Sequence, residues 1–248
     1  MDSDEYGDAF FQGTKYTRGD LPQRSPDFIV KPDDFKVYED AERMSLPRQF
    51  TFGPNDLKHV LEERRSRRRF SKEPMSLAEL STLLKYTSGI SGDETDQGNF
   101  ALRHVPSAGG LYPYETYVVV NNVDGVKNGL YHYYPPDHAL DVLKLGGDYG
   151  KKVAAICLDQ PMAKDCAAAF LWTLVSLRSK WKYGQRAYRY MFIDLGHLAQ
   201  NLYLVAEALQ LSTCAIGALY DDEGNEFLGV DGYDEALCYV GVVGRRVE

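Results

Sequence analysis

Five arginines and a serine are crowded into one short stretch of the chain, the run RRSRRRF at residues 64–70. A guanidinium group presents parallel N–H donors that match phosphate oxygens, and a serine hydroxyl can add a further hydrogen bond. A solvated basic face and an RNA-binding patch are the competing interpretations, because most basic runs lie on the surface. By itself the run does not decide between phosphate binding and plain surface.

A second motif, PSAGGLYP at residues 106–113, stands directly before an expected strand. Small side chains let the backbone approach a flat ligand, and Gly109 and Gly110 can take dihedral angles that are closed to other residues. A simple tight turn would explain the same residues. The motif is not a GxGxxG loop, and no strand precedes it, so it does not indicate a dinucleotide-binding unit.

A third motif is KYGQRAYRY at residues 182–190, followed on an expected helix by Asp194, His197, Gln200 and Asn201. His197 and Asn201 are four residues apart and therefore share one helix face. Such a polar face could pair with a second copy of the same helix. For His197, a core position with satisfied hydrogen bonds is favoured over a catalytic role.

Two weaker segments are CAIGA at residues 214–218 and VGRR at residues 243–246. The second places Arg245 and Arg246 at the end of an expected strand. Together with the first arginine run, these segments would offer two groups of arginine side chains and one backbone contact formed by small residues. That combination suits a flat, phosphorylated cofactor.

Several classes of function are disfavoured by composition and spacing. The histidines lack metal-ligand spacing and no GxSxG motif is present, so we expect neither a metal site nor a serine hydrolase. The net charge of -8 argues against nucleic acid as a partner. No apolar run approaches the roughly 20 residues of a membrane span. The four cysteines are expected to be reduced core thiols, and no secretory signal is visible, which predicts a cytoplasmic protein.

Local patterns predict where the first helices lie. Residues 1–53 are expected to be an irregular arm on the body or on a second subunit, and residues 54–248 the folded domain. Pro54 is expected to open a helix, and Ser76 with Glu79 forms a capping box before another. Residues 88–99 are expected to form a loop. The apolar anchors are Phe10, Phe11, Tyr16, Phe28, Ile29, Phe35 and Phe50 in the arm, and Leu57, Val60, Leu61, Leu77, Leu80, Leu83 and Leu84 in the helices.

Further along, the pattern predicts a long amphipathic helix over residues 188–209. Strands are expected over residues 116–120, 129–134, 139–145, 168–177, 213–219 and 236–243. Because helices and strands are interleaved without a regular βαβ rhythm, we expect an α+β fold.

The motifs, in this order, resemble the nitroreductase superfamily, and within it the SagB-type (thiazole/oxazole oxidase-like) dehydrogenases. The match covers residues 57–246 and includes PSAGGLYPYE at 106–115, the segment at 182–209 and IGALYD at 216–221. The resemblance implies a nitroreductase-like α+β fold with a central antiparallel or mixed sheet flanked by helices. It also implies an intertwined homodimer with two composite FMN sites and the helix at 188–209 as the dimer seam.

The resemblance assigns roles to individual residues. The flavin phosphate and ribityl oxygens would be bound by Arg64, Arg65, Ser66 and Arg68, and Arg245, with Arg246 beside it, would reach the phosphate. The isoalloxazine ring would lie against a loop of the other subunit, formed by Pro106, Ser107, Ala108 and Gly109. The flavin N5 edge would face backbone groups of Ile216 and Gly217.

Lys182 and Tyr183 match the Lys–Tyr pair with which azoline oxidases of this family remove a proton while a hydride passes to flavin N5. A lysine close to a phenol lowers the phenol's pKa, which would make Tyr183 a usable base. An interface aromatic is the alternative role for Tyr183.

Two features depart from the family. Gln210 stands where a helix-ending glycine is usual. The arm before Pro54 is short, and we expect no leader-peptide recognition domain. This second feature disfavours oxidation of peptide azolines, because that activity normally needs companion proteins. The favoured hypothesis is a two-electron FMN oxidoreductase acting on an azoline-like or other small organic or peptide substrate. The alternatives are an NAD(P)H-dependent nitro or quinone reductase, and a non-catalytic FMN-binding scaffold subunit of a modification complex.

Overall fold

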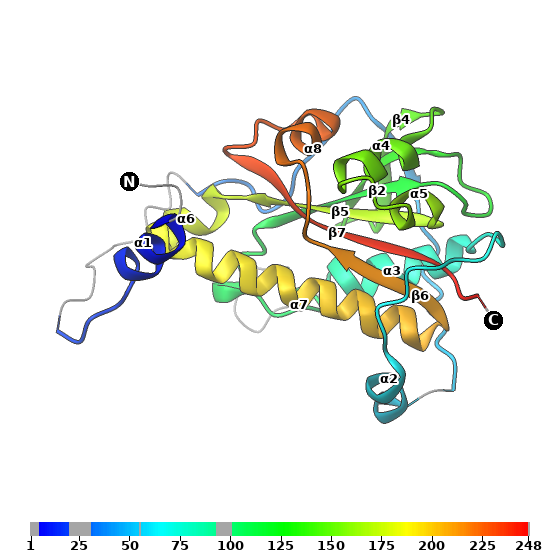
Figure 1. The fold of residues 1–248 in the computed structure, drawn as a ribbon, viewed down its shortest axis with the longest axis horizontal. Helices are drawn as coiled ribbons and strands as arrows, with labels where there is room; N and C mark the ends of the chain where they lie inside the picture. The colour runs from blue at the N-terminus through cyan, green and yellow to red at the C-terminus, as the bar shows by residue number, and fades with distance from the viewer. Residues whose placement is uncertain (1–4, 20–30, 55, 93–100, 248) are drawn as a thin grey trace.

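The computed structural model of the chain describes residues 5–19, 31–54, 56–92 and 101–247 (Figure 1). At its centre lies a seven-stranded sheet with the order β1-β4-β3-β2-β5-β7-β6, in which every neighbouring pair is antiparallel. The expected α+β fold with a central antiparallel sheet is confirmed. The strands are β1 (Glu42–Ser45), β2 (Tyr114–Val120), β3 (Gly129–Tyr134), β4 (Ala139–Leu145), β5 (Ala168–Val175), β6 (Leu211–Ile216) and β7 (Glu235–Arg245).

The two central strands β2 and β5 are buried along almost their whole length. Their sequences, YETYVVV and AAFLWTLV, are rich in β-branched and aromatic residues, which pack well on a pleated surface. Helices cover both faces of the sheet, so neither face of these strands meets solvent. This explains why β5 has a nearly continuous apolar sequence instead of an alternating one.

Helix α7 (Ala187–Ala208) and helix α3 (Leu77–Ser88) lie on one face of the sheet, as Figure 1 shows. The other face is covered by α4 (Tyr149–Ile156), α5 (Met162–Asp165) and α8 (Asp221–Leu228). The predicted capping box is present at the start of α3, where Ser76 and Glu79 cap each other's backbone N–H groups. At 1.5 Å per residue, α7 is roughly 33 Å long and runs the length of the sheet.

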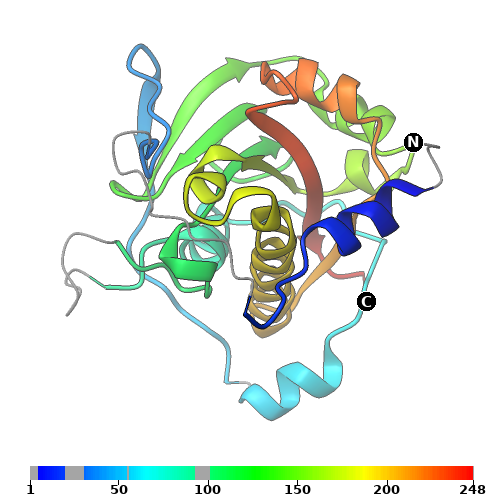
Figure 2. The same cartoon turned by 90° about the vertical axis from the view of Figure 1, so that its left-hand side faces the viewer.

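The N-terminal segment contributes a helix and a strand rather than irregular chain alone. Helix α1 (Tyr6–Gly13) lies beside the start of α7, where Arg189 donates to the Phe11 carbonyl and Arg186 to the Thr14 carbonyl (Figure 2). Strand β1 extends the sheet at its β4 edge. Phe28 and Ile29, two of the expected anchors, fall outside the described residues.

The prediction that Pro54 opens a helix was wrong. Helix α2 (Leu57–Glu63) begins later, because Asp56 is the N-cap and its carboxylate accepts the His59 N–H. Of the apolar residues expected on its face, Val60 is buried, whereas Leu57 and Leu61 are 66% and 55% exposed. The apolar face of α2 is therefore not part of the chain's own core.

The strand predicted over residues 213–219 begins and ends earlier in the structure. Strand β6 covers Leu211–Ile216, and helix α8 begins at Asp221. The end of α7 matches the sequence more closely. The helix stops at Ala208, and Gln210 has a φ of 59°, in the left-handed region that favours glycine. A non-glycine residue therefore occupies a turn conformation that favours glycine.

His197 is exposed on α7, so the expectation of a core histidine was wrong. Of the four cysteines expected to be core thiols, Cys157, Cys166 and Cys214 are buried and unpaired, whereas Cys238 is unpaired but only partly buried. Burial raises the pKa of Cys157 and Cys166 to about 12. Residues 93–99 of the expected loop fall outside the described part of the chain. Within that part, no helix is long and apolar enough to cross a membrane.

Candidate functional site

The arginine–serine run leaves the end of α2 and continues alongside β6, the edge strand of the sheet (Figure 1). Ser66 forms a parallel bridge with Thr213, and the Arg67 N–H donates to the Thr213 carbonyl at 2.9 Å. Arg65, Ser66 and Arg68 remain exposed. The run is therefore fixed in backbone position while several of its side chains stay open to a ligand.

Tyr203 of α7 joins this run to the strand beside it. Its hydroxyl accepts the Ala215 N–H at 2.8 Å and lies 3.0 Å from Ser66 Oγ. The Arg64 guanidinium lies over the same ring, 5.3 Å from its centroid. One side chain of α7 thus contacts both the arginine–serine run and the strand that leads to Ile216 and Gly217.

The two C-terminal arginines have different partners. Arg245 makes a bidentate ion pair with Glu79, at 2.7 and 2.9 Å, and also donates to the Pro74 carbonyl. Arg246 donates to Glu207 at 2.9 Å, and its Nε is buried with no partner in the described structure. Both arginines are thus paired with a carboxylate, but Arg245, the residue expected at a phosphate, uses all three side-chain nitrogens, whereas Arg246 retains an unpartnered Nε.

An open depression of about 450 Å³ lies next to the run. Its lining consists of Arg67, Arg68, Arg69, Ser212 and Val247. The Ser212 hydroxyl is buried and, among the described residues, has no hydrogen-bond partner. Three guanidinium groups and an unpartnered hydroxyl are a donor set that suits an oxyanion.

The PSAGG loop is anchored by Asp194 of α7. Ser107 Oγ donates to Asp194 Oδ2 at 2.6 Å, and the Ala108 N–H donates to the same carboxylate at 3.1 Å. Asp194 is only 2% exposed, and this burial raises its pKa. Asp194 was expected on a polar face that pairs with another copy of the helix. Instead it fixes a loop of its own chain.

Lys182 and Tyr183 lie at the end of α6 (Leu177–Tyr183), directly against Gly109. A Cβ atom added at Gly109 would lie 2.5 Å from the Tyr183 hydroxyl and 2.8 Å from Lys182 Nζ. Gly109 also has a φ of 70°, which other residues rarely adopt. Two motifs that are more than seventy residues apart in sequence are therefore in contact, and only glycine fits between them.

The electrostatic setting of Tyr183 differs from the expectation. Its pKa is raised, chiefly by burial and also by the neighbouring Tyr190, Asp194 and Tyr16. The Tyr190 ring lies 4.9 Å from the Tyr183 ring, edge to face. A lysine close by was expected to lower this pKa. In the structure burial and the neighbouring Tyr190, Asp194 and Tyr16 raise it instead.

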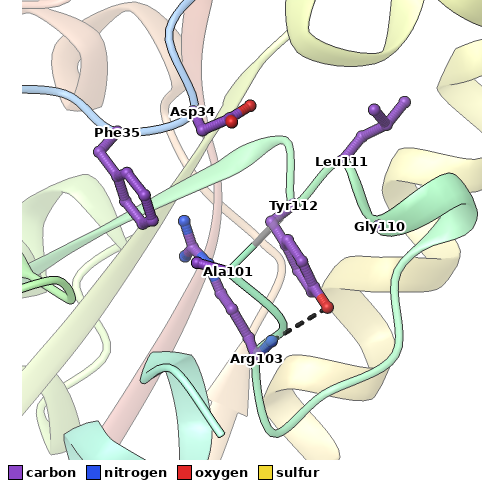
Figure 3. A pocket seen from close by; sticks show the side chains of 7 residues that line it. All are labelled: Asp34, Phe35, Ala101, Arg103, Gly110, Leu111 and Tyr112. Carbon is purple, nitrogen blue, oxygen red and sulfur yellow. Dashed lines mark hydrogen bonds between the residues drawn. The ribbon is translucent and has the colours of Figure 1, made fainter. Parts of the chain in front are cut away.

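Arg103 contacts Tyr112, which follows the PSAGG loop in sequence (Figure 3). Its backbone N–H donates to the Tyr112 hydroxyl at 3.0 Å, and its guanidinium lies 5.1–5.2 Å from the rings of Phe35, Tyr112 and Tyr114. The cavity between these residues measures about 10 Å³, which holds roughly one water molecule. This cavity is too small for a substrate, so we assign Arg103 to the support of the loop.

The predicted site residues thus form two groups within the chain. One group lies near the N-terminal half of α7 and contains Pro106 to Gly109, Lys182 and Tyr183. The other lies near the C-terminal end of α7, beside the strand that leads to Ile216 and Gly217, and contains the arginine–serine run and the C-terminal arginines. Asp194 and Glu207 mark the two groups on α7, and their separation along the helix axis is roughly 20 Å.

Tyr203, Glu207 and Ser212 were missed as site residues. Tyr203 and Glu207 are four apart on α7 and therefore share a helix face, which was the available signal. Their partners are distant in sequence: Tyr203 is 137 residues from Ser66, and Glu207 is 140 residues from Arg67. No group of His, Cys, Asp and Glu in the described ranges could hold a metal ion.

The family model "Nitroreductase family" matches residues 61–245. A curated nitroreductase homologue of Methanocaldococcus jannaschii is 38% identical over 192 residues, covering 77% of this chain and 92% of that protein. The trifolitoxin-processing protein TfxB of Rhizobium leguminosarum is 30% identical over 69% of this chain and 48% of its own length.

Among solved structures, a nitroreductase homologue from Anabaena variabilis has a TM-score of 0.78 at 28% identity, covering 95% of this chain and 45% of its own. The Escherichia coli microcin synthetase McbBCD complex gives a TM-score of 0.61 at 21% identity, covering 85% of this chain and 80% of the matched chain, which shows a shared fold. This chain therefore spans about half the length of the TfxB and Anabaena proteins. With the family model matching most of its length and the fold shared, the chain belongs to the nitroreductase family.

Proposed function

We propose that this chain is an FMN-dependent oxidoreductase of the SagB type, working as a homodimer with two composite sites. The observation that carries the proposal is the contact of Lys182 and Tyr183 with Gly109. It joins a proton-bearing pair to the small-residue loop that would lie against a flat ring. The family match and the fold support the same function.

The donors of the chain fit the phosphate end of FMN. The depression beside β6 is cationic, and Ser212 Oγ and Arg246 Nε are buried donors left over from the described hydrogen bonds. The exposed Ser66 and Arg68 belong to the same run. We assign the ribityl and phosphate oxygens to Arg64, Arg65, Ser66 and Arg68. Arg246 is a better candidate than Arg245 for the C-terminal contact, because Arg245 donates from all three side-chain nitrogens to Pro74 and Glu79, whereas Arg246 keeps an unpartnered Nε.

FMN, when bound, supplies two-electron hydride chemistry at its N5 atom. We assign the binding of the ring to the loop of Pro106, Ser107, Ala108 and Gly109, and the N5 edge to backbone groups of Ile216 and Gly217. Tyr183 and Lys182 handle the proton beside the ring. Because the raised pKa of Tyr183 keeps its hydroxyl protonated, the resting chain is prepared to donate a proton there.

The separation of the two groups along α7 supports the proposed dimer. A second copy packed along this helix would bring the loop and the Lys182–Tyr183 pair of one chain toward the arginines of the other. The outer surface of α7 exposes Phe192 and Ile193, each 55% accessible, and Leu57 and Leu61 of α2 are also exposed. On both helices these exposed apolar side chains offer surface that a second copy could cover.

The direction of the reaction has two candidates. The names of TfxB and of the microcin synthetase concern toxin processing and synthesis, and they favour dehydrogenation of an azoline-like small molecule or peptide. The raised pKa of Tyr183 disfavours the phenolate base that dehydrogenation would use, so reduction of a nitro compound or quinone with NAD(P)H as donor is the second candidate. A scaffold subunit that binds FMN without turnover is the non-enzymatic alternative.

Anaerobic mixing of the FMN-loaded protein with NADH or NADPH separates these candidates. A reductase is expected to lose its oxidised-flavin absorbance within the time of one turnover, and a dehydrogenase to keep it. A screen of small azolines, hydroquinones and peptides as hydride donors then tests the dehydrogenase. Flavin that no donor reduces would contradict any enzymatic role and support the scaffold.

A further inference from the structure

Glu207 occupies an unfavourable place for a carboxylate. It lies in the last turn of α7, where the helix dipole disfavours negative charge, and only 3% of its surface is exposed. A buried carboxylate is tolerated when it is paired and fully hydrogen-bonded. Two arginines meet this requirement. Arg67 Nη1 lies 2.5 Å from one carboxylate oxygen of Glu207, and Arg246 Nη2 lies 2.9 Å from the other. The position of Glu207 is therefore explained by the arginines rather than by the helix.

The two arginines come from distant parts of the chain. Arg67 belongs to the arginine–serine run, and Arg246 follows strand β7 at the C-terminal end. Their side chains are 25% and 33% exposed, so each reaches from the buried carboxylate to the surface. Phe70 and Arg246 also form an antiparallel bridge, which keeps the two segments side by side. Glu207 is the point at which both segments are tied to α7.

Arg67 also lines the depression that contains the unpartnered Ser212 hydroxyl. Arg67, Arg68 and Arg69 line the depression and Arg246 does not, so the excess of positive charge at its wall comes from those three arginines. A long, flexible arginine loses conformational entropy when it is immobilised on a ligand. An arginine already fixed by a carboxylate has lost that entropy on folding, so it binds a phosphate more tightly.

We propose that Glu207 is a positioning residue that holds Arg67 at this depression, and Arg246 beside it, ready for a phosphate monoester. Resting on the proposed function, the phosphate is the 5′-phosphate of FMN. Glu207 does not contact the phosphate, which it would repel, and acts only through the two arginines. The phosphate, and not the flavin ring, is the part of the cofactor whose binding depends on Glu207.

The test compares FMN with riboflavin, which lacks the phosphate, in titrations of the full-length apoprotein followed by flavin fluorescence. Glu207→Gln is expected to weaken FMN binding about tenfold, since two arginines lose their fixed orientation. Its affinity for riboflavin is expected to stay within about twofold of wild type. Glu226→Gln, an exposed glutamate on α8, is the matched control and is expected to change neither affinity.

Arg67→Met provides a second variant in case Glu207→Gln does not fold. It is expected to show the same loss for FMN alone, and the double variant should lose less than the product of the two single effects. Unchanged or tighter FMN binding by Glu207→Gln, or an equal loss for riboflavin, would overturn this inference alone. A wild-type chain that binds neither flavin would overturn the proposed function together with it.

Discussion

At the scale of single residues, Tyr183 is the side chain on which the proposed chemistry depends most. Tyr183→Phe removes one hydroxyl and keeps the ring that packs on Tyr190. We expect the rate of flavin reduction or reoxidation with substrate to fall about 100-fold, the size typical of a lost proton donor or acceptor. FMN affinity should not change. Stopped-flow kinetics measure this, with the exposed Tyr233→Phe as control, and equal rates in both variants would remove Tyr183 from the mechanism.

The sequence singled out candidate site residues by their type but not the residues that position them. Lys182, Tyr183 and Gly109 were singled out from their motifs, and the structure places them in contact. The partnership of Arg67 with Glu207 could not be seen, because it depends on how α7 lies across the sheet. The direction of the pKa shift of Tyr183 also depends on burial, which the neighbouring lysine in the sequence does not reveal.

At the scale of elements, the turn after α7 gives a test of backbone strain. Gln210 has a φ of 59° and an exposed side chain, so its substitution by glycine removes strain without removing a packed group. The left-handed conformation costs a non-glycine residue about 1–2 kcal/mol, partly offset by the greater entropy of glycine in the unfolded chain. Gln210→Gly is expected to raise the free energy of unfolding by about 0.5–1 kcal/mol in urea denaturation. A lower stability would show that the turn is not strained.

The same elements show what periodicity can and cannot predict. Strands β3 and β4 and the long helix α7 were predicted almost to the residue, since each carries a strong pattern over its whole length. Helices α4, α6 and α8 have seven or eight residues, too few for a clear apolar stripe. For α8 the acidic first turn and Gly229 at its end were usable signals.

At the scale of the whole molecule, buried tyrosines should limit stability in alkali. Tyr114, Tyr117 and Tyr133 are at most 1% exposed, and burial raises the pKa of each above its usual value of 10. Their stabilising effect is complete below pH 10 and is lost as the pH rises further, because the unfolded chain ionises first. Three such groups predict a loss of about 4 kcal/mol per pH unit above pH 10. Denaturation curves from pH 8 to 11 measure it, and a flat profile would contradict it.

A composite FMN site in a homodimer would be a property of the whole molecule. The most direct test is sedimentation velocity of the purified, FMN-saturated protein, followed at both the protein and the flavin absorbance. The account predicts that flavin sediments with protein at the mass of two chains, and that Ile193→Asp on the exposed face of α7 releases flavin and yields single chains. Flavin that sediments with a single chain, or protein that carries no flavin at all, would contradict it.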